Sequence, residues 1–230
     1  MIYLVSDIHG CYYSFLKLLK KIKLEDEDIL ICLGDLIDRG KWSFELLDYF
    51  MTHNNFKLIK GNHELFMDLY FNNILLEKDW WKFGGQYTIS SLKRMSKKEQ
   101  LKYYNYIHKL PLYIECNNYV LTHSGFNANF PFIEEKDLIN VTKTIELQYK
   151  THPYNYLISG DIHYMPKKYF DKQLIVGHVP TLHFGQPNIN YGPNCIDIDC
   201  GATYKNGKIG CLRLDDMEEF YVKIDKLDMI

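Results

Sequence analysis

Short loops of the sequence carry aspartate, asparagine and histidine side chains, which are residue types that bind divalent metals. Asp7 and His9 lie in the first of these loops, Asp35 in the second and Asn62 in the third. Carboxylate and amide oxygens, together with imidazole nitrogens, suit divalent metals such as Mn, Fe or Zn. If the loops converge, these groups need a cation, because crowded carboxylates otherwise repel one another. The candidate chemistry is therefore that of a metal site.

Three strand–helix units at the start of the chain must position these loops. Apolar runs at 2–5, 29–33 and 56–59 predict buried strands, and a segment with apolar residues at helical spacing follows each of them. Consecutive units of this kind imply parallel strands joined by right-handed crossovers. The loops after parallel strands meet at one edge of the sheet, where α/β proteins place ligands. We therefore expect the metal-binding residues to converge there.

Two histidines extend the candidate site into the second half of the chain. His123 follows an expected strand at 119–122, and His178 follows another at 174–176. The resulting set is too large for one catalytic metal with open positions, and it suits two metals ~3.5–4 Å apart that share a carboxylate. Asp35 is the expected bridge, because its loop lies between the other two N-terminal loops. The candidate ligands are Asp7, His9, Asp35, Asn62, His123 and His178.

The rest of the chain predicts a roof over the site and a β-rich second half. We expect a single domain over residues 1–230, with a mostly helical insertion at 72–110 that covers one side of the site. The aromatic stretch 80–88 inside this insertion, with its glycine pair, is interpreted as a loop. A hairpin turn at 117–118 begins a second half that we expect to be antiparallel, with one helix at 135–147.

The composition excludes several classes of protein. A formal net charge of −2 gives no reason to expect general binding to nucleic acids or to membranes. The six cysteines form no Cys-x-x-Cys pair, which favours reduced thiols in a cytoplasmic protein. The chain starts on an apolar strand without the basic and apolar regions of a signal peptide, and no apolar run approaches the ~20 residues of a membrane helix. We expect a cytoplasmic protein.

Five motifs in order resemble those of the metallophosphoesterase superfamily. They are Asp7-x-His9, Gly34-Asp35-x-x-Asp38-Arg39-Gly40, Gly61-Asn62-His63-Glu64, His123-Ser124-Gly125 and Gly177-His178-x-Pro180. Each is weak alone, and together they are specific. The Asp-Arg-Gly extension narrows the resemblance to the branch of phosphoprotein phosphatases and symmetric diadenosine tetraphosphatases, which includes the lambda-type serine/threonine phosphatases. The match runs from residue 2 to about residue 214.

This resemblance implies an α/β (α+β) fold, built as a four-layer α/β/β/α sandwich with two divalent metal ions at the strand ends. Manganese is the preferred metal, and Fe, Zn, Ni or Co are compatible. One metal would be bound by Asp7, His9 and Asp35. The other would be bound by Asp35, Asn62, His123 and His178.

The resemblance also implies roles for residues beside the metals. His63 would donate a proton to the leaving group, and Asp38 would orient its imidazole. Arg39 would grip the phosphoryl oxygens with its planar fork. Lys60 stands where family members often carry an arginine, and it would supply charge without that fork. A water bridging the metals would attack phosphorus in line with the leaving oxygen.

One stretch departs from the lambda-type pattern. That pattern has an arginine upstream of the Gly-His motif, but residues 157–163 contain none. We interpret His163, at the end of this stretch, as a polar loop residue rather than a substrate-binding one.

Three functions follow from the resemblance. The leading one is hydrolysis of phosphomonoesters, above all phosphoserine and phosphothreonine in proteins, with a phosphorylated protein or a small phosphoester as the partner. The alternative is symmetric hydrolysis of dinucleoside polyphosphates such as diadenosine tetraphosphate. The least favoured is a non-catalytic binding protein, because a binder has no use for the Asp38–His63 pair.

Overall fold

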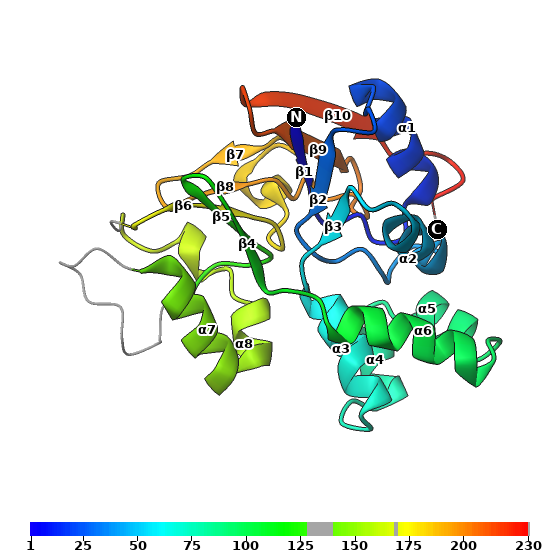
Figure 1. The fold of residues 1–230 in the computed structure, drawn as a ribbon. Coiled ribbons are helices and arrows are strands. Elements are labelled where there is room, and N and C mark those ends of the chain that lie inside the picture. Colours follow the sequence, from blue (N-terminus) through cyan, green and yellow to red (C-terminus); the bar gives the residue numbers. More distant parts are fainter. Residues whose placement is uncertain (128–139, 168–169, 230) are drawn as a thin grey trace.

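The computed structural model describes residues 1–127, 140–167 and 170–229. Its first five-stranded sheet consists of β1 (Ile2–Val5), β2 (Ile29–Cys32), β3 (Phe56–Leu58), β9 (Lys208–Arg213) and β10 (Glu218–Lys223). The strands lie in the order β10-β9-β1-β2-β3, with β1, β2 and β3 parallel and β9 antiparallel to both of its neighbours (Figure 1). The expected parallel arrangement of the three N-terminal strands is confirmed.

The second sheet also has five strands, but it is not antiparallel throughout. Its strands are β4 (Tyr113–Cys116), β5 (Tyr119–Thr122), β6 (Gln173–Val176), β7 (Asn190–Tyr191) and β8 (Cys195–Asp197). β4 and β5 form the expected hairpin, whereas β5, β6 and β8 are parallel. The antiparallel expectation was wrong for these three strands, because the long connections between them act as crossovers, which parallel pairing requires.

Helices flank the two sheets. They are α1 (Tyr12–Ile22), α2 (Ser43–Thr52), α3 (Asn62–Phe71), α4 (Glu77–Lys82), α5 (Gln86–Leu92), α6 (Lys97–His108), α7 (Val141–Thr151) and α8 (Pro153–Leu157), with 3-10 turns at Asp161–His163 and Thr181–Phe184. In Figure 1, α1 and α2 lie against the first sheet, and α7 and α8 lie beside the second. The helix expected at 135–147 corresponds to α7 in part, and residues 128–139 lie outside the described residues.

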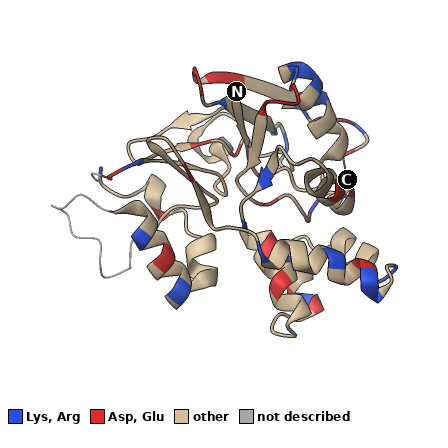
Figure 2. Ribbon diagram, viewed as in Figure 1, with Lys and Arg blue, Asp and Glu red and all other residues tan. Residues whose placement is uncertain are grey.

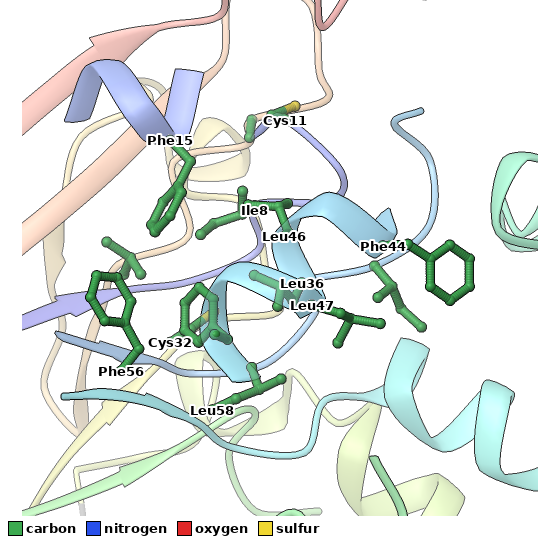
Figure 3. Close-up of a cluster of buried hydrophobic side chains, with 14 of the residues drawn as sticks. Ile8, Cys11, Phe15, Cys32, Leu36, Phe44, Leu46, Leu47, Phe56 and Leu58 are labelled. Carbon is green, nitrogen blue, oxygen red and sulfur yellow. The ribbon is translucent and has the colours of Figure 1, made fainter. Parts of the chain in front are cut away.

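Alternation along the strands produces the layers. Tyr3 and Val5 point into a hydrophobic cluster with residues of α1 and α2. Figure 3 shows part of this cluster in close-up, with Phe15 of α1 and Leu46 of α2 labelled. Leu4, between them, points the other way into a second cluster that includes Leu121 and Ile175 of the second sheet. Successive side chains of a strand face opposite sides, so one face of the sheet packs on helices and the other on the second sheet. This is the predicted α/β/β/α sandwich.

The aromatic stretch at 80–88 forms parts of two helices, not a loop. α4 and α5 meet at Gly84, whose φ of 97° allows the tight turn. Trp80 is fully buried and packs 5.3 Å from the ring of Tyr70, while Ile89 and Leu92 are also buried. The loop prediction was wrong because these apolar side chains have helical neighbours to pack against: α4 lies against α3, and α5 lies against α2 and α4. α4, α5 and α6 lie together with α3 in Figure 1.

Charged side chains are dispersed over the outer helices and turns. Figure 2 shows Lys and Arg interspersed with Asp and Glu, as the formal net charge of −2 leads one to expect. Within the described parts of the chain, no helix has both the length and the apolar character that a bilayer crossing requires.

Candidate active site

The loops after β1, β2 and β6 carry candidate ligands on strained backbone. Asp7, His9, Asp35 and His178 have positive φ angles of 52°, 47°, 53° and 73°. Such angles are uncommon outside glycine, because the left-handed region crowds the Cβ atom. They persist when the surrounding structure fixes them, and they cluster at functional sites. The uncommon backbone angles therefore occur at four of the residues that the sequence predicts as metal ligands.

The first ligand group lies around His9. Its Nε2 atom is 3.6 Å from Asp35 Oδ2 and 3.8 Å from Asp7 Oδ1. The other Asp7 oxygen accepts hydrogen bonds from the Ser6 hydroxyl and, at 3.0 Å, from the backbone N–H of His178. These bonds leave Oδ1 directed at His9, so the three side chains can face one cation.

The second ligand group lies on the other side of Asp35. His123 Nε2 is 3.5 Å from Asp35 Oδ1 and 2.9 Å from Asn62 Oδ1. Candidate ligand atoms of Asp35, His123 and His178 lie within 4.8 Å of one another. Asp35 is the residue common to both groups, as expected of a bridge, because β2 lies between β1 and β3. The structure thus brings all six candidate ligands together.

The histidine tautomers suit metal binding. His9 Nδ1 lies 3.0 Å from the carbonyl oxygen of Ile37, and His123 Nδ1 lies 2.8 Å from that of Leu33. Each Nδ1–H can donate to its carbonyl, which leaves Nε2 with a lone pair that faces the carboxylates. His9 Nε2 is buried without a hydrogen-bond partner among the described residues. An orphaned, buried acceptor in this position fits a metal ligand.

The electrostatics of the site also call for a cation. Burial lowers the pKa values of His9 and His178 well below their usual range, so both rings are held in the neutral form that binds metals. Burial raises the pKa of Asp35 well above its usual range; His63 opposes this shift and Asp7 adds to it. A divalent cation would offset the desolvation of this carboxylate. The residues present fit two divalent metal ions.

The candidate proton donor is paired as the resemblance implies. His63 Nδ1 lies 2.8 Å from Asp38 Oδ2, and both side chains are buried. Arg39 Nη2 lies 3.4 Å from His63 Nε2, which brings the candidate phosphate clamp next to the proton-donating atom. His63 Nε2 is also 3.7 Å from Asp35 Oδ2. By distance alone His63 could also bind the metal that His9 faces, so its role as a donor stays a prediction.

Glu64 has a structural role that the sequence analysis did not assign. Its carboxylate accepts hydrogen bonds from the backbone N–H groups of Asp35, Leu36 and Gly61 at 2.8, 2.9 and 2.9 Å. One buried side chain therefore joins the loop after β2 to the start of α3. Its position three residues after Gly61, as in a capping box, was the available signal.

Trp80 was also missed. Its Nε1–H donates a hydrogen bond of 2.6 Å to Asp38 Oδ2, the same oxygen that faces His63. A loop at residues 80–88 would not fix the position of the indole, whereas α4 does, so the contact was not predicted.

Lys60 is not placed where a phosphate clamp would need it. Its buried ammonium donates to Asp68 Oδ2 at 3.1 Å and to the carbonyl oxygen of His108 at 3.1 Å. These bonds tie the end of β3 to α3 and α6. These contacts favour a structural role for Lys60, and its predicted role in substrate binding stays a prediction.

His163, which we interpreted as a polar loop residue without a role in substrate binding, is buried. It ends a 3-10 turn, its side chain is only 3 % exposed, and its Nε2 lies 3.5 Å from Asp197 Oδ2. Its Nδ1 lies 3.7 Å from Cys195 Sγ. Burial lowers the pKa of His163 to about 4. The contacts are those of a packed residue against β8, and they include none of the candidate ligands.

A hollow opens beside Arg39. Its volume is about 560 Å³, and its lining residues are Arg39, Gly84, Gln86, Tyr87, Thr203 and Tyr204. The Arg39 guanidinium lies 5.8 Å from the ring centroid of Tyr204, a cation–π distance. The hollow thus adjoins the candidate proton donor through Arg39.

A family model described as calcineurin-like phosphoesterase matches residues 1–222. The chain belongs to this family. The match takes in both sheets and every candidate ligand, which agrees with the geometry of the site. Calcineurin-like phosphoesterases are hydrolases, and the family assignment implies divalent metals at the site described above.

Two curated relatives of this phosphoesterase carry the same name. A symmetrical bis(5'-nucleosyl)-tetraphosphatase from Buchnera aphidicola subsp. Baizongia pistaciae (strain Bp) is 27 % identical over 158 residues, which cover 66 % of this chain and 52 % of the relative. One from Salmonella newport (strain SL254) is 37 % identical over 78 residues, or 33 % of this chain and 28 % of the relative. The chain spans about half or less of the length of these relatives.

Solved structures share the fold of this phosphoesterase. A putative diadenosine tetraphosphatase superimposes with a TM-score of 0.61 at 17 % identity, over 96 % of this chain and 93 % of the other. A protein serine/threonine phosphatase from Saccharomyces cerevisiae gives 0.56 at 14 % identity, over 98 % and 80 %. At these identities the comparison supports the fold alone, and the predicted fold class is confirmed.

Proposed function

We propose that this phosphoesterase hydrolyses dinucleoside tetraphosphates symmetrically, with release of two nucleoside diphosphates. The observation that carries the proposal is the tyrosine-lined hollow beside Arg39, at the side of the site where His63 would meet a leaving group. The names of the curated relatives favour the same substrate class. Hydrolysis of phosphoserine and phosphothreonine in proteins, which the sequence motifs favoured, becomes the second candidate.

The hollow has the chemistry of a nucleoside site. Tyr87 and Tyr204 offer aromatic faces on which a base can stack, and Gln86 offers an amide that can pair with the edge of a base. A volume of about 560 Å³ lies within the range of small-molecule pockets, roughly 300–1,000 Å³. Arg39, at the border of the hollow, can bind a phosphate that is attached to the ribose of the bound nucleoside. One half of a symmetric dinucleotide would occupy this hollow.

The residues of the chain supply positioning and proton transfer. Bound divalent cations would acidify a water and neutralise charge on the phosphoryl group. Arg39 would orient the phosphoryl oxygens, because its guanidinium presents several N–H donors in one plane. His63 would give its Nε2 proton to the leaving oxygen, with Asp38 stabilising the charged imidazole through Nδ1. We propose Mn²⁺ as the first metal to supply, since the ligand set accepts several.

Product analysis tests this proposal. The protein is incubated with diadenosine tetraphosphate and Mn²⁺, and the nucleotides are separated by ion-exchange chromatography. ADP as the sole product is expected. A mixture of ATP and AMP would contradict symmetric cleavage, and intact substrate would contradict the activity. Tyr87→Ala and Tyr204→Ala should raise KM for the dinucleotide severalfold and leave KM for an aryl phosphate unchanged.

A phosphomonoesterase acting on phosphoserine and phosphothreonine remains the second candidate. The Asp38–His63 pair favours it, because an alkoxide leaving group needs a proton more than a nucleoside diphosphate does. A phosphoserine peptide, assayed for released phosphate beside the dinucleotide, distinguishes the two. A larger kcat/KM for the peptide than for the dinucleotide would make phosphomonoester hydrolysis the leading candidate. Turnover of neither substrate, nor of an aryl phosphate, would favour a binding protein on the same fold.

A further inference from the structure

One oxygen of Asp38 receives two N–H donors. His63 Nδ1 approaches Oδ2 at 2.8 Å and Trp80 Nε1 at 2.6 Å, and all three side chains are buried. We propose that Trp80 is a positioning residue for proton transfer: its indole fixes the Asp38 carboxylate, which in turn aims His63 at the leaving group. This inference rests on the proposed hydrolysis of phosphoesters, and its effect is largest for substrates with an alkoxide leaving group.

The indole is itself rigidly held. Trp80 has no exposed surface and packs 5.3 Å from the ring of Tyr70. Its backbone N–H donates to the carbonyl of Leu76 at 3.1 Å at the start of α4. A Cβ atom at Gly85 would lie only 2.6 Å from Trp80 Cδ1, so the indole fills the space against this backbone. A donor this constrained fixes the direction of the carboxylate that it binds.

The same segment also supports Arg39. The Arg39 N–H donates to the carbonyl of Gly84 at 2.8 Å, and a Cβ atom at Gly84 would lie 2.8 Å from Arg39 Cγ. Asp38 and Arg39 both have positive φ angles, 69° and 60°, so this part of the β2 loop needs outside support. α4 and the turn after it therefore position the carboxylate and the guanidinium on either side of His63.

The second oxygen of the Asp38 carboxylate does not help to hold it in place. Oδ1 is buried and has no hydrogen-bond partner among the residues that the structure describes. Without the indole, the carboxylate would keep a single side-chain partner, His63, and would be free to rotate about its Cβ–Cγ bond. The imidazole would then lose its fixed orientation, because its tautomer and direction depend on the carboxylate that it faces.

The adjacent tryptophan provides a matched control. Trp81 occupies the next position of α4 and is 46 % exposed. A change to phenylalanine removes an indole N–H at either position, but only Trp80→Phe removes the contact with Asp38 and shortens a buried ring.

Leaving-group dependence tests the inference. In Trp80→Phe we expect kcat to fall by roughly 10–100-fold for an alkyl phosphate, the usual effect of removing an outer partner of a functional side chain. We expect kcat for p-nitrophenyl phosphate and KM for both substrates to change less than threefold, because a good leaving group needs little proton donation. Trp81→Phe should match the wild type with both substrates.

An NMR measurement provides a readout independent of activity. The protein has three tryptophans, so an indole-labelled ¹H–¹⁵N spectrum holds three Nε1–H signals, and Trp80→Phe identifies that of Trp80. We expect this signal to be shifted downfield by the carboxylate and to move upfield in Asp38→Asn. An unmoved signal, or a loss of kcat in Trp80→Phe that is equal for both leaving groups, would overturn the inference. If the wild type hydrolysed none of these phosphates and left diadenosine tetraphosphate intact, the proposed function would be overturned instead.

Discussion

The backbone N–H of His63 donates a hydrogen bond of 3.0 Å to Asp35 Oδ1. The carboxylate that lies between the two ligand groups thus also holds the turn that carries the candidate proton donor. Its other oxygen, Oδ2, faces His9 at 3.6 Å. The candidate metal site and the candidate proton donor are therefore joined through one side chain, which ties the loop after β2 to the start of α3.

Asp35→Asn should remove both metal binding and turnover. The substitution keeps the shape of the side chain and replaces one charged oxygen with an NH₂ group that cannot bind a cation. We expect the metal content, measured by plasma mass spectrometry, to fall by at least one ion per chain and kcat to fall by roughly 10³-fold or more. The exposed Asp26→Asn serves as control. A variant with full metal content would refute the bridging role.

His63→Ala should separate proton donation from metal binding. We expect both metals to stay bound, and kcat for an alkyl phosphate to fall by roughly 10²–10⁴-fold, the usual contribution of general acid catalysis. An aryl phosphate with a good leaving group should be affected far less. The distance of 3.7 Å between His63 Nε2 and Asp35 Oδ2 leaves a ligand role open, and the loss of one metal would establish it.

Lys60→Met should destabilise the fold without impairing the chemistry. The substitution removes the ammonium from the partly buried Asp68, which keeps its contacts with Asn72 and His108, and breaking a buried ion pair costs about 3 kcal/mol. We expect urea unfolding to reveal this loss and kcat, corrected for the folded fraction, to stay within twofold of the wild type. Replacing both partners, in Lys60→Met/Asp68→Leu, should restore part of the stability. A raised KM for the phosphate substrate in the single variant would return Lys60 to the substrate site.

His163 should make stability depend on pH. Burial lowers the pKa of this ring from 6.5 to about 4 in the folded protein. Between these values the unfolded chain binds more protons than the folded one, so the free energy of unfolding falls as the pH is lowered. From pH 7 to pH 5, one group with this shift removes roughly 2 kcal/mol.

Urea unfolding at the two pH values, in EDTA so that metal release does not contribute, measures this effect. The loss on acidification should be roughly 2 kcal/mol smaller in His163→Gln than in the wild type. The exposed His53→Gln should lose as much as the wild type. Equal losses in all three proteins would mean that His163 does not contribute.

The predicted ligand set depended on local patterns that the fold preserves. Asp7, Asp35 and Asn62 could be placed at one edge because buried strands alternate and parallel units bring their loops together. Trp80 and Lys60 could not be placed in this way. The contact of Trp80 with Asp38 depends on how α4 is rotated on α3, and the sequence offers two adjacent tryptophans without a local reason to choose between them.

The second sheet was misjudged for a related reason. Whether β5 and β6 pair parallel or antiparallel depends on the path of the fifty residues between Thr122 and Gln173, not on the strands themselves. Their apolar runs are compatible with either direction. Lys60 illustrates the same limit at one residue. A lysine beside a Gly-Asn-His turn suggests a phosphate ligand, but its partners in the structure, Asp68 of α3 and the carbonyl of His108 in α6, lie further along the chain.

The position of β1 between β2 and β9 has a consequence for biosynthesis. β1 leaves the ribosome well before its antiparallel neighbour, because one of its two edges is paired by Lys208–Arg213, about two hundred residues further along the chain. Until then, a strand of Ile, Tyr, Leu and Val presents an unpaired edge that can associate with other chains. The nascent chain should therefore depend on holding chaperones until β9 emerges and covers this edge.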